Sequence, residues 1–238
     1  MDTHRIDFIS AYCDRWCERC AFTDRCSAFA CRIAQGMCGD LADAIELAVG
    51  APHPVEGTPH ETVGANLLAE CATFEPSDEE LAEFKREEQA RDARLDVAPA
   101  TRMATTYMLG ATAWLTQHHD GLVTRADPIV REAVEIVGWD ACVIGAKVHR
   151  ALDGRDRSQN GEDECDDHPV QTDWNGSAKV ALISLERSEA AWRVIVNATE
   201  DGTASALADA AGNLRRIVLD EFPQAMSFIR PGFDEPRR

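Results

Sequence analysis

Apolar residues recur every three to four positions along most of this chain, and the strict alternation typical of strands is almost absent. The clearest stretch is 128–152, where the apolar positions form one helical stripe: Val130, Val134, Val137, Ala141, Ile144, Val148 and Leu152. Asp127 is a natural N-cap, Pro128 suits the first helical position, and Gly154 is expected just past the helix end. The pattern predicts a long amphipathic helix with one face in a core.

The same reasoning predicts further helices on both sides of this one. Capping-box sequences at Thr58 and Ser77 indicate helices that run to about residues 73 and 95. Three more helices are expected over 100–118, 176–198 and 203–222, the last of them stopped by Pro223. Short connections between helices of this length favour an all-α, antiparallel helical bundle.

Two stretches interrupt the helical pattern, and a third differs from it in composition. Residues 51–60 are a Pro/Gly loop, and residues 153–175 are polar, strongly acidic and best interpreted as a solvated loop. Residues 1–40 are rich in cysteine. We therefore expect a cysteine-rich metal-binding module over 1–40 that packs against a helical bundle over 41–238, with the apolar tail at 228–233 docked on the bundle.

Charge and the apolar pattern limit the compartment and the partners. The 238 residues include 42 acidic and 24 basic side chains, for a formal net charge of −18, which disfavours nucleic acid and anionic membrane surfaces. The amino terminus has acids where a secretion signal has bases, and no apolar run reaches the roughly 18 residues of a membrane helix. These features predict a cytoplasmic protein whose partner, a redox protein or another protein, is unknown.

Four cysteines lie close together in the sequence CDRWCERCAFTDRC, at Cys13, Cys17, Cys20 and Cys26, and Cys31 and Cys38 follow. Cytoplasmic thiols are kept reduced, and nine cysteines is an odd number, so metal binding is a better interpretation than a disulfide framework. Thiolates are soft ligands that suit zinc, copper(I) and iron–sulfur clusters. Buried structural thiols are the simplest alternative, because free cysteine is often a small core residue.

The spacing favours an iron–sulfur cluster over the other metals. Structural zinc sites usually use two short cysteine pairs, whereas this run has only the pair Cys17 and Cys20. Clusters often take several ligands from one compact run, which predicts a [4Fe–4S] centre with Cys31 as a reserve ligand. Zinc is the alternative. Copper(I) is third, and it requires residues 11–38 to form one helix with a thiol stripe of Cys13, Cys17, Cys20, Cys31 and Cys38.

Two resemblances bear on this site. The first three cysteines have the C-x3-C-x2-C spacing of radical-SAM enzymes, and CERCAFTDRC resembles their auxiliary-cluster domains, but the chain lacks the strands of a β/α barrel. Only the cluster-binding spacing is carried over. The whole chain resembles a group of uncharacterised bacterial proteins that open with AYCDRWCERCAFTDRC, contain NGSAKVALISLERSEAAW and finish near FIRPGFDE. That resemblance implies a helical, bacterial, cytoplasmic protein and no particular activity.

Other candidate residues are weaker. Glu135, Cys142 and His149 share one helix face, but residues seven apart are about 10 Å apart along a helix, so a solvated face is expected. His118 and the two residues after it are expected to end a helix. The common hydrolase and phosphate-loop motifs are absent from the sequence. The leading hypothesis is electron transfer or redox sensing; the alternatives are a structural or interaction protein with a zinc-clipped or metal-free amino terminus, and an enzyme with a pocket between helices.

Overall fold

The computed structural model describes residues 5–49, 76–125, 127–161 and 168–235. These residues are mostly helical and contain no strand, which confirms the all-α prediction. The chain forms two compact units. The first unit comprises residues 1–6 and 20–90, and the second unit comprises residues 7–19 and 91–238. The division therefore falls between Arg19 and Cys20, inside the cysteine run, and not near residue 40.

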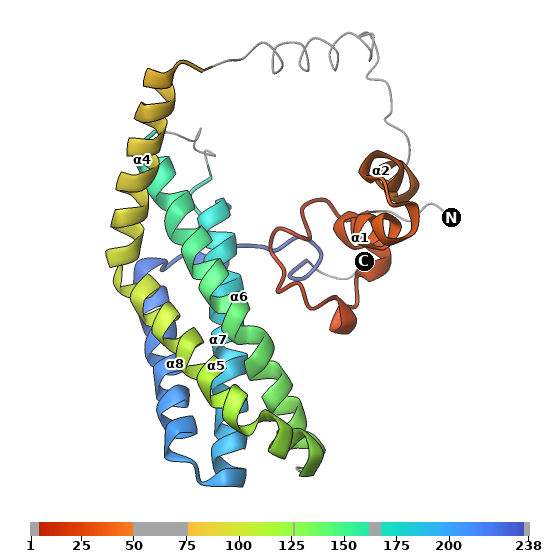
Figure 1. The fold of residues 1–238 in the computed structure, drawn as a ribbon, viewed down its shortest axis with the longest axis vertical. Helices are drawn as coiled ribbons and strands as arrows, with labels where there is room; N and C mark the ends of the chain where they lie inside the picture. The colour runs from red at the N-terminus through yellow and green to blue at the C-terminus, as the bar shows by residue number, and fades with distance from the viewer. Residues whose placement is uncertain (1–4, 50–75, 126, 162–167, 236–238) are drawn as a thin grey trace. The chain divides into compact units, whose positions relative to one another are not determined.

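The second unit contains an antiparallel bundle of four helices (Figure 1). These are α5 (Pro99–Arg125), α6 (Pro128–Gln159), α7 (Asp173–Thr199) and α8 (Gly202–Glu221). Helix α6 packs between α5 and α7, and α8 packs against α7 and α5. Short connections between α5 and α6 and between α7 and α8 reverse the chain, as expected for neighbouring antiparallel helices.

Side-chain caps define the starts of three bundle helices. The Asp127 carboxylate accepts a hydrogen bond of 2.8 Å from the Ile129 amide, and Pro128 follows as the first residue of α6. Thr172 caps α7 in the same way, and Asp201 caps α8. Each cap satisfies backbone N–H groups that have no partner inside the helix. The predicted start of α6 is therefore confirmed.

The bundle core follows the predicted apolar stripes. Its largest buried side chains include Tyr107, Val134, Val137, Ile144, Leu185, Trp192 and Leu214. The Tyr107 hydroxyl lies 2.5 Å from the Ser188 hydroxyl and accepts a hydrogen bond of 2.9 Å from the Trp192 indole. Burial raises the pKa of Tyr107 to about 12. Three buried polar side chains, one on α5 and two on α7, are thus paired with one another, which favours one packing arrangement.

Two predicted helix ends are wrong, because tertiary contacts extend the helices. Helix α6 passes Gly154 and continues to Gln159, so it includes the first part of the acidic stretch. An ion pair of 2.7 Å between Arg94 and Asp156 supports this extra turn. Helix α5 likewise continues past His118, whose ring stacks on Trp114 and lies 2.8 Å from the Trp114 carbonyl oxygen through Nδ1.

The carboxyl-terminal tail docks on the bundle, as predicted. Phe228 is buried, and its carbonyl oxygen accepts a hydrogen bond of 2.6 Å from Lys179 Nζ in α7. Lys179 also lies 2.7 Å from Asp234, which pairs in turn with Arg230. Hydrogen bonds from Arg230 and Lys179 hold the pKa of Asp234 well below its usual range, although burial acts in the opposite direction.

The first unit has a small helical hairpin, made of α1 (Ser27–Cys38) and α2 (Leu41–Val49). Gly39 ends α1 with a left-handed φ of 75°, a conformation that glycine adopts without a Cβ clash. Among the side chains described in these two helices, Ala34 and Ala44 are buried. The predicted loop over 51–60 lies outside the described residues, as does the whole of the helix predicted over 58–73.

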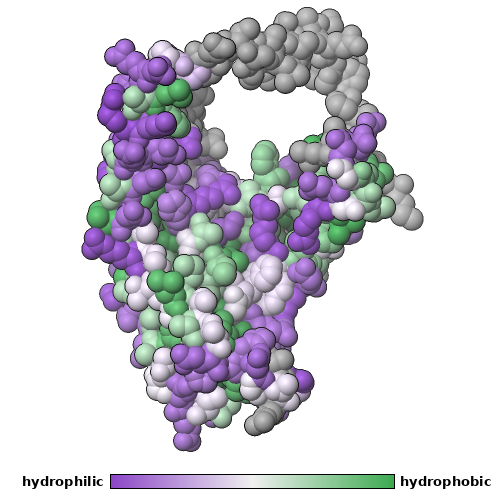
Figure 2. Space-filling model, viewed as in Figure 1, coloured by the Kyte–Doolittle hydropathy of each residue, from purple (hydrophilic) through white to green (hydrophobic). Residues whose placement is uncertain are grey.

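Helix α4 (Asp78–Val97) begins with the predicted capping box. The Glu80 carboxylate accepts a hydrogen bond of 2.8 Å from the Ser77 amide, and Ser77 Oγ accepts one of 3.3 Å from the Glu80 amide. Bonds from the Ser77 backbone and hydroxyl lower the pKa of Glu80. Most of α4 is exposed, and Figure 2 shows mainly hydrophilic side chains along it.

Candidate metal-thiolate site

The candidate ligand cysteines occupy short turns and the start of a helix. Cys17 begins a 3-10 turn, η1 (Cys17–Arg19), and a second turn, η2 (Thr23–Arg25), follows. Cys26 is the N-cap of α1 with extended backbone angles, φ −103° and ψ 114°. The unbroken helix over 11–38 is therefore wrong, and with it the thiol stripe that favoured copper(I). Arg15, at a left-handed φ of 60°, shows that the chain leaves helical geometry before Cys17.

Within the second unit, Arg187 forms ion pairs with Asp14 and Asp140, and this triad holds the segment with Cys13 and Cys17 on the bundle. The Arg187 guanidinium of α7 donates hydrogen bonds of 2.8 Å to Asp14 and 3.0 Å to Asp140. Asp140 of α6 is 0% exposed, and burial raises the pKa of its carboxyl group against the opposing effect of Arg187. Because Asp14 directly follows Cys13, the triad fixes the backbone beside this thiol.

Aromatic contacts fasten the same segment a few residues later. Trp16 stacks on Trp139 of α6, with ring centroids 5.2 Å apart and planes inclined by 14°. The Trp139 indole also donates a hydrogen bond of 2.9 Å to the Asp14 carbonyl oxygen. The Arg19 guanidinium lies 3.9 Å from the Trp16 ring centroid and donates a bond of 2.6 Å to Glu135. Residues on both sides of Cys17 are therefore held by the bundle.

A buried lysine lies beneath the start of this segment. Lys147 of α6 is 9% exposed, and its ammonium group donates a hydrogen bond of 2.8 Å to the Ala11 carbonyl oxygen. Burial lowers the pKa of Lys147 to about 8, Arg150 adds to this effect, and Cys13 opposes it. Burial also raises the pKa of the Cys13 thiol, whereas Lys147 lowers it. The two groups thus interact electrostatically inside the second unit.

The cysteines of the first unit have a different environment, in which backbone amides point at sulfur. The Phe22 amide donates to Cys20 Sγ at 3.4 Å, and the Phe29 amide donates to Cys26 Sγ at 3.4 Å. Cys26 is also the N-cap of α1, where the helix dipole favours negative charge. Cys31 is half-buried within α1. N–H groups directed at sulfur stabilise a thiolate and tune a metal bound to it.

The predicted ligand cysteines are divided between the two units. Cys13 and Cys17 belong to the second unit, and Cys20, Cys26 and Cys31 belong to the first. All five are half-buried and none is in a disulfide. Across the described ranges, no three histidine, cysteine, aspartate or glutamate side chains are grouped closely enough to hold a metal ion.

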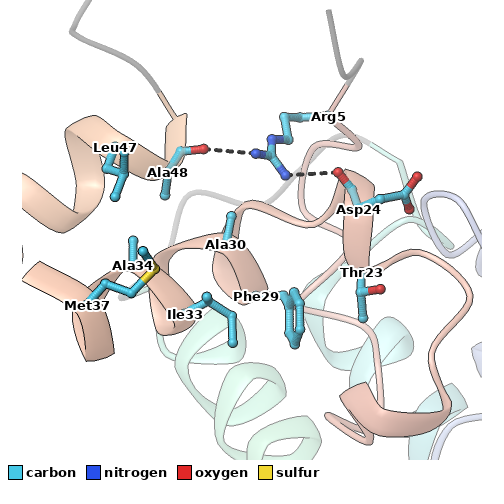
Figure 3. Close-up of a pocket in the computed structure, with 10 residues that line it drawn as sticks. All are labelled: Arg5, Thr23, Asp24, Phe29, Ala30, Ile33, Ala34, Met37, Leu47 and Ala48. Atoms are coloured by element: carbon cyan, nitrogen blue, oxygen red, sulfur yellow. Dashed lines mark hydrogen bonds between the residues drawn. The ribbon is translucent and has the colours of Figure 1, made fainter. Parts of the chain in front are cut away.

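The hairpin of the first unit also has an apolar groove, about 340 Å³ in volume (Figure 3). Phe29, Ile33 and Met37 line it from α1, and Leu47 and Ala48 line it from α2. At one end, the Arg5 guanidinium donates hydrogen bonds of 3.1 Å to the Asp24 carbonyl and 2.9 Å to the Ala48 carbonyl. No cysteine is among the residues that line the groove.

The weaker candidates do not form a site. Glu135, Cys142 and His149 are exposed along one face of α6, as expected, and Glu135 is used in the ion pair with Arg19. His118 packs on Trp114 and lies 3.6 Å from Asp201. The histidines near the Pro/Gly loop lie outside the described residues.

The sequence analysis did not identify three charged residues that hold the segment with Cys13 and Cys17 on the bundle. They are Asp140, Lys147 and Arg187. Asp140 and Lys147 lie on the buried side of α6, among the apolar positions Val137, Ile144 and Val148. A charged residue on a buried helix face needs a partner, so this position was itself a usable signal. Arg187 gives no comparable signal, because it lies at the edge of the apolar stripe of α7.

Comparison with protein-family models, with curated proteins and with solved structures gave no match. Among the described helices, none is both long and apolar enough to span a membrane. The interpretation of the site therefore depends on its own residues.

Proposed function

We propose that this is a cytoplasmic metal-thiolate protein that carries a [4Fe–4S] centre and acts in electron transfer or redox sensing. The proposed ligands are Cys13, Cys17, Cys20 and Cys26, with Cys31 in reserve. Four thiolates complete the coordination of such a cluster. The cluster would supply the electron chemistry, and the chain would hold the thiols, shield them from water and direct hydrogen bonds at sulfur.

The observation that carries this proposal is that backbone amides donate hydrogen bonds to cysteine sulfur atoms. Two of the four proposed ligand sulfurs, those of Cys20 and Cys26, accept amide hydrogen bonds. Such bonds are among the main means by which a protein adjusts the reduction potential of a cluster. The bond to Cys26 also caps α1, so the bond from the Phe22 amide to Cys20 is the one that capping does not explain.

The contacts that hold the segment around the first two cysteines on the bundle support the same function. The stretch around Cys13 and Cys17 is fixed by Arg187 and by the stacked Trp16 and Trp139. Metal sites depend on such outer contacts to orient their ligands. The arginines of the run, including Arg19, place positive charge near thiolates whose combined charge is negative.

Anaerobic purification followed by a visible spectrum and by assays of iron, zinc, copper and acid-labile sulfide tests the proposal. We expect a brown protein with stoichiometric iron and sulfide. A colourless protein with stoichiometric zinc would instead favour the structural or interaction class, with zinc clipping the amino terminus. A reduced protein that contains no metal would refute both metal hypotheses and leave buried structural thiols.

Two serine variants locate the centre. Cys17→Ser removes a proposed ligand and should abolish the iron and sulfide content. Cys142→Ser removes an exposed thiol on α6 and is the matched control, so its metal content should equal that of the wild type. Equal metal content in both variants would show that the ligand assignment is wrong.

A further inference from the structure

The second unit has a pocket of about 390 Å³, which is lined by residues of α5, α6 and the segment 7–19. Leu115 of α5 and Val134 of α6 line it together with the indole rings of Trp16 and Trp139. Its volume is typical of small-molecule sites, which are mostly apolar and have a few polar groups. None of the proposed ligand cysteines lines the pocket, so the inference drawn from it does not depend on the metal centre.

A glycine in the lining distinguishes this pocket from a packing gap. Gly138 lies inside α6, where glycine is the least favourable residue after proline. The nearest atom that a Cβ at this position would meet is Leu115 Cδ1, at an ordinary contact distance of 3.7 Å. At Gly176, by contrast, a Cβ would clash with the ring of Tyr12. The neighbouring helix therefore does not require glycine at position 138, and the missing side chain keeps the pocket open.

The charges at the pocket indicate the sign of a ligand. Glu135 lines the pocket, and no lysine or arginine is among the lining residues. The Arg19 guanidinium donates hydrogen bonds of 2.6 Å to Glu135 Oε2 and 3.2 Å to Glu132, so two carboxylates share one positive charge. His119 also lines the pocket, and its Nδ1 lies 3.1 Å from the carboxylate of Asp120. This excess of carboxylates attracts a cation and repels an anion.

The indole rings favour the same charge. The Arg19 guanidinium lies 3.9 Å from the Trp16 ring centroid, and that of Arg187 lies 5.4 Å from it. The face of an indole ring attracts cations because its π-electrons are negative there. The rings of Trp16 and Trp139 also offer flat apolar surface, against which an aromatic group can stack. A ligand with both a positive charge and a flat apolar part therefore fits this lining best.

We propose that this pocket binds a small organic cation, a primary amine attached to a flat apolar body. The apolar body packs against Trp16 and Trp139 and over Gly138. The ammonium group donates a hydrogen bond to Glu135 Oε1, the oxygen that the ion pair with Arg19 does not use. The missing side chain at residue 138 provides the space, and the carboxylate selects the charge.

The first test compares three ligands of similar shape and different charge. Phenethylamine is the cationic probe, phenethyl alcohol is its neutral counterpart, and phenylacetate is an anionic one. Titrations of the full chain, followed by tryptophan fluorescence and by NMR shifts of the Gly138 amide, measure the three affinities. We expect phenethylamine to bind at least about tenfold more tightly than the other two.

The second test uses two pairs of variants on α6. Gly138→Ala adds a methyl group to the pocket and should weaken phenethylamine binding, whereas Gly145→Ala, outside the pocket, should not. Gly138→Leu should abolish binding, and Gly138→Ala serves if far-UV circular dichroism shows that the leucine variant is not folded. Glu135→Gln should weaken binding by about threefold to tenfold. Glu132→Gln, which also removes a partner of Arg19 but does not line the pocket, should bind like the wild type.

Two kinds of result would overturn the proposal. A wild type that does not bind phenethylamine, or a folded Gly138→Leu protein that binds it as tightly as the wild type, would show that this pocket is not the site. Equal affinities for phenethylamine and phenylacetate would show that the pocket does not select a cation. An equal loss in Glu132→Gln and Glu135→Gln would assign the effect to the overall charge of the surface, which would also contradict the role of Glu135.

Discussion

The two parts of the cysteine run are built in different ways. Residues 7–19 are held to a large helical bundle by buried charges and stacked indoles, as the contacts of Asp14 and Trp16 show. The hairpin of α1 and α2 buries Ala34 and Ala44 among the side chains that the structure describes. Several larger side chains of its helices are exposed, Met37 to 75%, whereas Phe29 is half-buried.

This difference bears on the proposed metal centre, whose candidate ligands lie in both parts of the run. The bundle can fix the Cys13 side of the run before any metal binds, because its contacts are complete in the second unit. Few of the apolar side chains described in the hairpin are buried, and burial is the main favourable contribution to folding. We expect metal binding to stabilise the first unit more than the second.

The largest effect should come from Arg187→Ala, which breaks the triad of the second unit. The variant leaves Asp140 fully buried without its partner, and removal of one member of a buried pair costs about 3–5 kcal/mol. We expect the free energy of unfolding, measured by urea denaturation with tryptophan fluorescence, to fall by an amount near the lower end of this range. Asp140 can take up a proton and become neutral, which reduces the cost of burying it without a partner. The double variant Asp140→Leu/Arg187→Met, which has no buried charge, should recover most of the loss. A single variant as stable as the wild type would mean that the triad does not hold in solution.

A smaller effect is expected from Gly176→Ala, which disturbs the packing of Tyr12 on α7. A Cβ atom at residue 176 would lie 2.5 Å from Tyr12 Cδ1 and 2.8 Å from Phe228 Cζ, so both rings would have to move. Overpacking of this kind costs about 1–3 kcal/mol, and the better helix propensity of alanine offsets only part of it. Gly145→Ala is the control, since its nearest neighbour would be Met108 Sδ at 3.8 Å. A stabilised Gly176→Ala protein would show that Tyr12 is not seated there.

The buried lysine predicts a pH dependence of the second unit. The pKa of Lys147 is lowered to about 8 in the folded protein from 10.5, so the unfolded chain binds more protons between these values. Stability should therefore rise with pH, by about 1 kcal/mol from neutral to about pH 9. Above that range, the raised pKa values of Cys13 and Tyr107 act in the opposite direction. Urea denaturation at several pH values measures the rise, which Lys147→Met should abolish; a rise that persists in the variant would assign it to another group.

The sequence was sufficient to predict most of the bundle. Apolar periodicity identified α5 to α8, and the caps Asp127 and Ser77 were placed correctly because capping is a local interaction. The ends of α5 and α6 were predicted too early, since contacts far along the chain extend them. Arg94, for example, supports the last turns of α6 through Asp156, 62 residues away.

For the candidate site, the sequence indicated only the ligand residues, and their assignment stays a prediction. The cysteine spacing pointed to these thiols, but the turns between them depend on backbone conformations, such as the left-handed φ of Arg15, that local propensity disfavours. The fastening residues Arg187 and Lys147 are far from the cysteines in sequence, and only the folded bundle brings them to the segment. Of these two residues, only Lys147 leaves a signal in the sequence, as a charged residue on the buried face of α6, and that signal does not indicate which segment it contacts.

The smallest effect is expected in the hairpin, from Met37→Ser in α1. An exposed side chain loses little when it is truncated, so the free energy of unfolding should change by no more than about 0.5 kcal/mol. Ile144→Ser, at a buried position of α6, is the contrasting control and should cost several times more. Thermal unfolding by far-UV circular dichroism, with gel filtration alongside, checks both variants. A large loss in Met37→Ser would mean that the groove beside Met37 is covered in solution. The contrast between an open hairpin and a filled bundle would then be wrong, because both units would be stabilised by burial.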